Sequence, residues 1–225
     1  MKRINASGLA LCAVSAAILA YAPAPASATV LCSKQVTPCG AANTYPAGTQ
    51  VNTWMPTMTT AVLETTLANV TCLKWGIGIK TTSAGGLGIS VAGRVNGVTV
   101  AECTIPNNQT CNVKAANFGA TEPEWWGATF EKGSKGNGEL TIGPSSLGAF
   151  GLSVACNERG ETISCVFTNG STFPVTGGVY PGSPAKIAGG VKLKPVSGSK
   201  CPGTEATWKF NWEVWEPPNF YLEAN

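Results

Sequence analysis

The sequence predicts an all-β fold, an antiparallel β-sandwich or barrel of about ten short strands that is stapled by disulfides. Large apolar residues alternate with polar ones through most of the chain, most clearly from Trp208 to Val214, as a sheet with one buried and one wet face requires. Turns rich in glycine and asparagine separate the alternating runs at short intervals. The number and placement of cysteines indicate cross-links between the strands.

The expected strands follow one another along the chain. In order they occupy residues 50–54, 73–79, 87–91, 97–103, 126–132, 139–143, 148–156, 163–168, 185–196 and 208–214. Turn residues predict chain reversals at 84–86, 96–97, 133–138, 157–160 and 169–170. Segment 58–67 is the best helix candidate, but its threonines favour strand or loop. Segment 173–184, rich in proline and glycine, is expected to be a long loop within one domain.

Residues 1–28 have the parts of a secretory signal peptide. Lys2 and Arg3 supply positive charge, residues 9–20 form a short apolar run, and residues 26–28 are small, as at a cleavage site. We therefore expect export and a mature chain of one secreted all-β domain, residues 29–225. No later run approaches the roughly 20 apolar residues that cross a bilayer, so no transmembrane segment is expected in the mature chain. The compact, alanine-rich signal is typical of bacteria.

Cysteine usage fits this extracytoplasmic address. Of nine cysteines, Cys12 belongs to the signal, and the remaining even number in an exported chain predicts four disulfides. The mature cysteines are Cys32, Cys39, Cys72, Cys103, Cys111, Cys156, Cys165 and Cys201. They contain no CxxC pair, and the chain has no histidine, so neither a metal site nor a cofactor is expected.

The phase of the strands predicts which cysteines pair. Cys156 and Cys165 are each in phase with the apolar residues of adjacent expected strands, so we expect them to bond. Proximity in the chain likewise predicts a bridge between Cys32 and Cys39. For the four others we weigh two pairings. We favour Cys103–Cys111 with Cys72–Cys201, and the alternative is Cys72–Cys103.

Charge and composition exclude several classes of function. The mature chain carries 13 basic residues and 12 glutamates, because Lys2 and Arg3 of the 15 leave with the signal. These charges are scattered singly, unlike the basic face of a nucleic-acid-binding protein, so no nucleic-acid partner is expected. The chain contains neither histidine nor aspartate. Histidine-dependent hydrolases, aspartic dyads and EF-hand-like calcium loops therefore lack their parts.

Glutamate is the acid that remains for catalysis. A glycosidase can work with two carboxylic acids that face each other across a cleft. Glu122 and Glu124, beside two tryptophans, are the cluster that fits this alternative, a glutamate-dependent glycan-active enzyme. The simpler interpretation is a solvated loop before the next strand, so we do not expect an enzyme.

Three tryptophans are out of phase with the core residues of their strands. Trp54, Trp125 and Trp215 are expected to project from the sheet, where indole rings can stack on the apolar C–H faces of sugars. The competing interpretation is that they pack beneath loops. We expect a non-enzymatic secreted or cell-envelope protein with a structural or binding role, its partner being an extracellular polysaccharide or a surface protein.

Several short motifs occur in a recognisable order. They are Tyr-Pro-Ala-Gly-Thr at 45–49, Thr-Cys at 71–72, Cys103, Pro-Glu-Trp-Trp at 123–126, the segment between Cys156 and Cys165, and Cys-Pro-Gly at 201–203. In this order the chain resembles a group of exported, cysteine-containing, β-rich bacterial proteins of uncharacterised function. The resemblance covers most of the mature chain and implies architecture and location. It implies no catalytic residues.

Overall fold

The structure of the protein is a computed structural model. The structure describes residues 29–65, 69–86, 88–105, 109–116, 126–132, 137–143, 151–158, 161–168, 175–196, 201 and 204–224. The expected signal peptide, 1–28, lies outside these residues. Within these residues, every regular element is a strand apart from one short 3-10 helix, Ala41–Asn43. The strands are β1 (Thr29–Cys32), β2 (Gln50–Trp54), β3 (Ala61–Thr65), β4 (Asn69–Thr81), β5 (Gly85–Gly86), β6 (Val91–Ile105), β7 (Gln109–Ala116), β8 (Gly127–Lys132), β9 (Gly138–Ile142), β10 (Gly151–Glu158), β11 (Glu161–Thr168), β12 (Val175–Tyr180), β13 (Ala185–Pro195), β14 (Ala206–Glu216) and β15 (Tyr221–Ala224).

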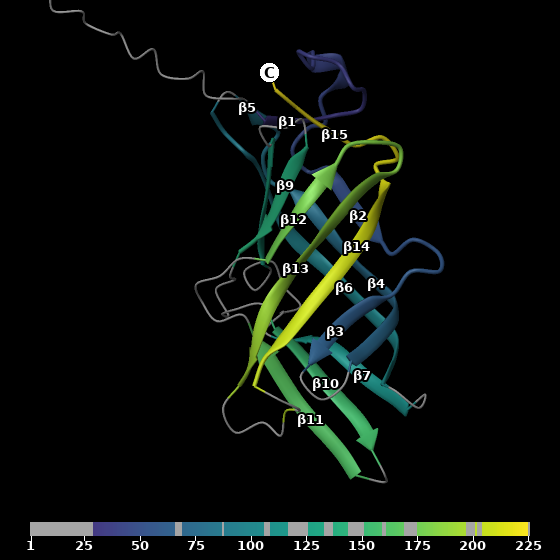
Figure 1. Ribbon diagram of the computed structural model, residues 1–225. Coiled ribbons are helices and arrows are strands. Elements are labelled where there is room, and N and C mark those ends of the chain that lie inside the picture. The colour runs from purple at the N-terminus through teal and green to yellow at the C-terminus, as the bar shows by residue number, and fades with distance from the viewer. Residues whose placement is uncertain are drawn as a thin grey trace, which may run out of the picture.

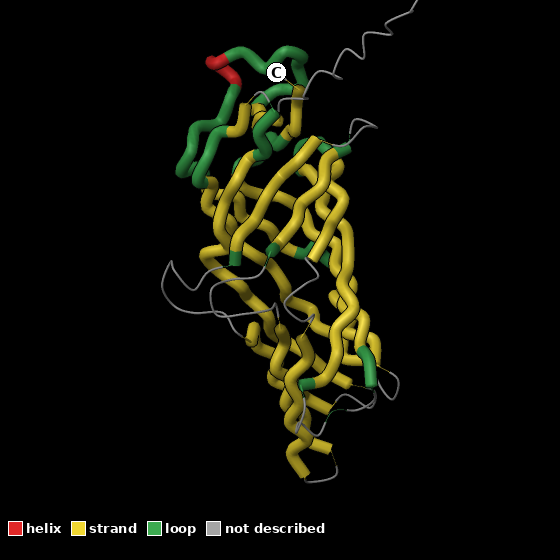
Figure 2. Tube along the Cα trace, turned by 90° about the vertical axis from the view of Figure 1, so that its left-hand side faces the viewer, coloured by secondary structure: helices red, strands yellow, loops and turns green. Residues whose placement is uncertain are grey.

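In the described part of the chain, the main sheet has twelve strands and curls until it closes on itself. All its pairings are antiparallel, which confirms the predicted fold class. Additional pairings β6–β4, β14–β3 and β11–β13 join strands that lie apart in the sheet order. They produce two closed rings, an upper one in the order β2-β4-β6-β8-β9-β12-β13-β14 and a lower one in the order β3-β4-β6-β7-β10-β11-β13-β14. β4, β6, β13 and β14 run through both rings and make the body elongated (Figures 1 and 2).

A small three-stranded sheet, β15-β1-β5, lies over the upper end of the upper ring (Figure 1). Leu31 of β1, Leu222 of β15 and nearby Phe220 are buried in the same apolar cluster as the ring interior. The small sheet therefore closes that end of the body by burying apolar surface. In the described residues, no helix has the length and apolar character needed to cross a bilayer.

Alternation fills the interior of the rings with large side chains. On β14, Trp208, Phe210 and Trp212 point inward and are buried, and Trp75 of β4 packs against Trp208 with ring centroids 4.3 Å apart. A closed sheet of eight strands leaves an interior just wide enough for side chains to fill. The predicted strand at 208–214 is thus confirmed as a central strand of the fold.

Residues 55–60 connect β2 of the upper ring to β3 of the lower ring. Its turn is closed by the Thr59 N–H, which donates to the Pro56 carbonyl at 3.1 Å. Met58 stands in this turn with φ 68°, in the left-handed region, and is 99 % exposed. A non-glycine residue there is strained.

Replacing Met58 by glycine should raise the free energy of unfolding by about 0.5–1 kcal/mol, because glycine adopts positive φ without a Cβ penalty. Chemical denaturation of the two proteins measures the difference. Met58→Ala is the matched control, since it removes the same exposed side chain but keeps the strain. An equal gain from alanine and glycine would contradict this explanation.

Three expectations about the strands are wrong. Asn96 and Gly97 do not form a turn, because β6 continues through them to Ile105. Segment 173–184 is not all loop, since β12 (Val175–Tyr180) pairs with both β9 and β13. In the described part of segment 87–91, Ile89 makes a single bridge and β6 begins only at Val91, so residues 88–90 do not form the expected strand. In the first two cases pairing with distant strands outweighs the local sequence signal.

Four buried half-cystines form one row across four neighbouring strands. Cys72 of β4 lies directly opposite Cys103 of β6, Cys103 opposite Cys111 of β7, and Cys111 opposite Cys156 of β10. The disulfides are Cys72–Cys103 and Cys111–Cys156. The alternative pairing, Cys72–Cys103, is therefore observed, and the favoured Cys103–Cys111 and Cys72–Cys201 are wrong. A Cys103–Cys111 bond would leave Cys72 and Cys156 about 14 Å apart, three strand spacings, too far to bond.

The expected Cys156–Cys165 bond is also wrong. Both cysteines are buried on adjacent strands, as predicted, but the register sets Cys156 opposite Ile163 and Cys165 opposite Val154. Cys165 bonds instead to Cys201, before β14. Cys32–Cys39, beside the small sheet, is confirmed. Four disulfides indicate an oxidising, extracytoplasmic setting.

Candidate functional site

Two of the three candidate tryptophans lie on adjacent strands of the upper ring. Trp54 ends β2, is 38 % exposed and stands opposite Glu213 of β14. Trp215 of β14 is 59 % exposed and occupies a β-bulge, where the register shifts between Val214 and Glu216. Bulges re-aim side chains next to functional sites. The two tryptophans are therefore on adjacent strands, and both side chains are exposed.

The other candidates cannot be placed. Glu122, Glu124 and Trp125 all lie outside the described residues. The pairing that a glutamate-dependent enzyme needs is thus not part of the site described below.

A cluster of side-chain amides lies beside the tryptophans. The Gln50 Nε2 donates to Asn52 Oδ1 at 2.9 Å and to Asn96 Oδ1 at 3.1 Å, while Asn96 Nδ2 donates back to Gln50 Oε1 at 2.8 Å. Asn52 Nδ2 donates to Glu216 Oε2 at 2.5 Å. Each carboxamide is thereby held in one orientation while remaining only partly buried. We name Trp54, Trp215, Gln50, Asn52, Asn96 and Glu216 the aromatic–amide patch.

Two glycines of β4, Gly76 and Gly78, lie beneath the side chains of the patch. A Cβ on Gly78 would meet the side-chain amides of Asn96, Asn52 and Gln50 at 2.8–3.0 Å. A Cβ on Gly76 would meet the Trp54 ring at 2.9 Å. These glycines let the side chains of β2 and β6 lie flat across β4, because no Cβ stands between them.

Sequence reasoning missed the polar half of the patch. Gln50 and Asn52 alternate with buried Val51 and Thr53, so their outward direction could have been inferred. Asn96 could not be found, because the sequence assigns it to a turn. Only the pairing of β2, β4 and β6 brings the three amides together.

The patch carries one formal charge, that of Glu216, and Lys80 of β4 lies opposite Gln50 beside it. Glu213, opposite Trp54, lies 3.9 Å from the Lys186 Nζ on β13, a loose and exposed ion pair. Glu216 accepts the Asn52 hydrogen bond. Such an arrangement offers flat apolar rings flanked by fixed donors and acceptors, and suits a neutral ligand rich in hydroxyl groups.

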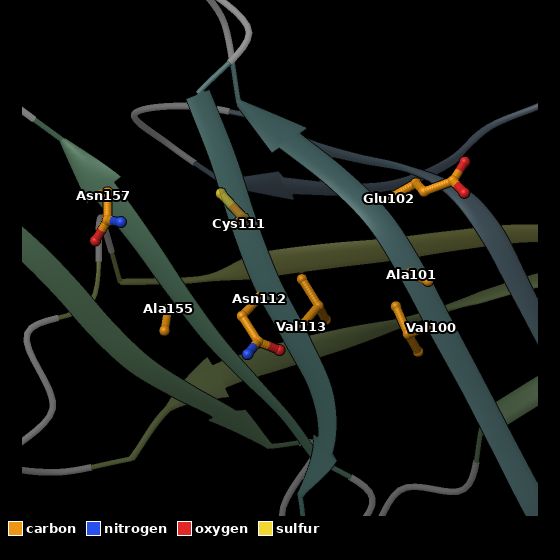
Figure 3. Close-up of a pocket in the computed structure, with 8 residues that line it drawn as sticks. All are labelled: Val100, Ala101, Glu102, Cys111, Asn112, Val113, Ala155 and Asn157. Carbon is orange, nitrogen blue, oxygen red and sulfur yellow. The ribbon is translucent and has the colours of Figure 1, made fainter.

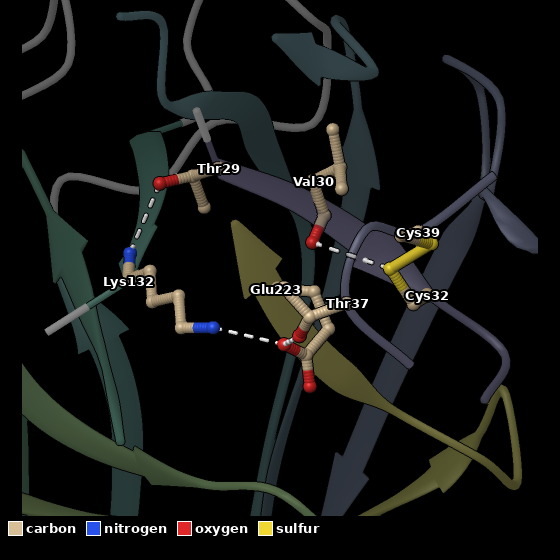
Figure 4. A network of polar contacts seen from close by, with 7 residues as sticks. All are labelled: Thr29, Val30, Cys32, Thr37, Cys39, Lys132 and Glu223. Carbon is tan, nitrogen blue, oxygen red and sulfur yellow. Dashed lines mark hydrogen bonds and ion pairs between the residues drawn. A yellow bond between two sulfur atoms is a disulfide. The ribbon is translucent and has the colours of Figure 1, made fainter. Parts of the chain in front are cut away.

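A second polar network lies between the small sheet and β8, at the upper end of the upper ring (Figure 4). Glu223 of β15 is buried, and its Oε2 accepts from the Lys132 Nζ and the Thr37 hydroxyl, both at 2.8 Å. The Lys132 backbone N–H donates to the Thr29 hydroxyl at 3.1 Å. These contacts join the small sheet to β8. We assign this network a structural role.

Replacing Lys132 by methionine should lower the free energy of unfolding by about 2 kcal/mol, because Glu223 is left buried without its cation. Thermal or urea unfolding measures the loss. Lys209→Met is the matched control: Lys209 makes an ion pair of the same 2.8 Å length with Glu64, but both side chains are exposed. Its loss should be within about 0.5 kcal/mol. Equal losses in the two variants would show that burial does not strengthen the Lys132 pair.

The comparisons with known proteins add no relative. No protein-family model, curated protein sequence or solved structure matches the chain. Within the described part of the chain, no three histidine, cysteine, aspartate or glutamate side chains gather into a group that could hold a metal ion.

Proposed function

We propose that this protein is a non-enzymatic β protein, exported to the cell envelope or its surroundings, that binds an extracellular polysaccharide through the aromatic–amide patch. The observation that carries the proposal is the exposure of Trp54 and Trp215 on adjacent strands, beside amides that are already fixed by hydrogen bonds. Exposed indoles provide large apolar contact area with a polar N–H at the edge.

The chemistry of the patch favours a sugar polymer over a protein. Sugar rings present an apolar C–H face to an aromatic ring and hydroxyl groups around their edge. Each carboxamide offers both donors and acceptors, which match those hydroxyls. Because the amides hold one another in place, little side-chain entropy is lost on binding.

The extracytoplasmic part of the proposal is supported by the disulfides, and the non-enzymatic part by the composition. Four disulfides suit a protein that works outside the reducing cytoplasm. The sequence has no histidine or aspartate to move a proton.

Retention on insoluble or immobilised polysaccharides tests the proposal. The purified protein is passed over a panel of bacterial cell-wall and plant polysaccharides, and the bound fraction is compared with that of Trp54→Ala, Trp215→Ala and the double variant. We expect retention on at least one polymer, weakened about tenfold or more by the double substitution, since stacked aromatics dominate such contacts.

Ile89→Ala is the matched control, because Ile89 is 59 % exposed, as Trp215 is, but lies outside the patch. It should bind as the parent protein does. Absence of retention on every polymer, or retention that the double variant keeps, would refute the proposal. Release of soluble sugars from a retained polymer would refute its non-enzymatic part.

A further inference from the structure

A cavity opens in the lower ring where β6 and β7 separate. Their described ladder pairing is confined to Cys103–Ile105 of β6 and Gln109–Cys111 of β7. Beyond it, β7 continues along β10, whereas β6 runs on to pair with β8 through residues 91–94. The cavity between these strands has a volume of about 480 Å³ (Figure 3). That volume is within the usual range for small-molecule sites.

The backbone of β6 is irregular at the rim of the cavity. Glu102 has φ 56°, in the left-handed region, and the inward-facing residues of β6 change phase there, from Val98 and Val100 to Cys103. Lys74 of neighbouring β4 pairs with Glu102 at this position. The strain of a non-glycine residue in this region is thus placed at the rim of the cavity.

The lining combines two carboxamides with an apolar floor. Asn112 of β7 lies opposite Ala155 of β10, and Asn157 is two residues further along β10 on the same outer face. Figure 3 shows Ala155 between the two asparagines, with Val100 and Val113 in the gap between β6 and β7. Asn112 and Asn157 are exposed, so their amides face the solvent side of the cavity.

The charge of the lining narrows the ligand class. No lysine or arginine lines the cavity in the described residues, and its one carboxylate, Glu102, is paired with Lys74. An anion would find no counter-charge there, and a cation would have to displace Lys74. The lining offers the methyl groups of its valine and alanine side chains together with the amide donors and acceptors of its two asparagines. This combination suits a compact neutral ligand with hydroxyl groups on one side and C–H groups on the other.

We infer that this cavity is a second, separate saccharide site, which takes one or two neutral sugar units between Asn112, Asn157 and Ala155. The choice of sugar as ligand rests on the proposed function, whereas the site itself is independent of the patch. Asn96 of the patch and Val100 of the cavity are four residues apart on β6, about 13 Å along the strand. A long glycan can therefore contact both sites, and a disaccharide can occupy one alone.

Nuclear magnetic resonance of the isotope-labelled protein tests the inference. The side-chain NH₂ signals of Asn112 and Asn157 are followed while cellobiose, maltose, lactose or diacetylchitobiose is added at millimolar concentration. We expect saturable shifts with at least one sugar. Ala155→Tyr fills the cavity from an outward strand position that tolerates an aromatic residue, and should weaken the response about tenfold or more.

Lys192→Tyr is the control, because it places the same side chain at an exposed position of β13 outside the cavity. It should respond as the parent protein does.

The Trp54→Ala, Trp215→Ala double variant should also keep the asparagine shifts, and loss of the shifts there would refute a separate site. No shift with any sugar, an undiminished response in Ala155→Tyr, or shifts with trialanine but not with sugars would each overturn the inference. Asparagine shifts without retention on polysaccharide would leave the cavity site standing and remove the patch.

Discussion

Replacing Trp208 by alanine should lower the free energy of unfolding by about 3–5 kcal/mol, the largest loss we expect from a single substitution. Trp208 is 1 % exposed, and its ring centroid lies 4.3 Å from that of Trp75, 4.9 Å from Phe210 and 5.8 Å from Trp212. Its position on β14, a strand of both rings, means that the cavity left behind adjoins the aromatic core of the whole body.

Urea unfolding followed by far-ultraviolet circular dichroism measures this loss, and Trp215→Ala is the matched control. Both tryptophans belong to β14, but Trp215 projects from the outer face. Its replacement should change the stability by no more than about 0.5 kcal/mol. If the two variants lost equal stability, the inward phase of β14 would be contradicted.

Removing the Cys111–Cys156 bridge by a double alanine substitution should lower the free energy of unfolding by about 4 kcal/mol. The two cysteines are 45 residues apart in sequence, and in the chain-entropy model a loop of this length is strongly restricted in the unfolded state. The Cys32–Cys39 bridge, with a sequence separation of 7 residues, closes a much shorter loop, so its removal should cost less. Denaturant titration of the two double variants gives the order. The reverse order would contradict this account of the bridges.

The row of cysteines makes a sharper prediction about covalent structure. Replacing Cys72 and Cys156 together leaves Cys103 and Cys111, which lie directly opposite each other on β6 and β7. Directly opposite residues are within reach of a disulfide, so a new Cys103–Cys111 bridge should form. Peptide mapping without reduction detects it. Two free thiols in that variant would show that the β6–β7 register is wrong.

Local patterns predicted much of the fold, because alternation is a property of each strand alone. Strands β2 and β14 have the expected positions, and the inward direction of Trp208 and Trp212 follows from period two. The pairing of cysteines did not follow, because it depends on which strands are neighbours. Cys156 and Cys165 are on adjacent strands and both buried, yet a two-residue offset in register directs each to a different partner.

The candidate site divides in the same way. The outward phase of Trp54 and Trp215 could be read from their strands, and both side chains are exposed. The amide cluster required the long-range pairing of three strands, and Asn96 carried a turn signal that β6 overrides. The glycine pair beneath the patch, Gly76 and Gly78, resembles ordinary strand alternation in the sequence, so nothing local indicates that side chains from β2 and β6 cross it.

Saccharide binding at the aromatic–amide patch is tested most directly by the indole N–H signals of the tryptophans in an isotope-labelled sample. An oligosaccharide cut from a polymer that retains the protein should shift the signals of exposed Trp54 and Trp215. It should leave those of buried Trp75 and Trp212 unchanged. Unshifted Trp54 and Trp215 signals at saturating oligosaccharide would contradict the proposal.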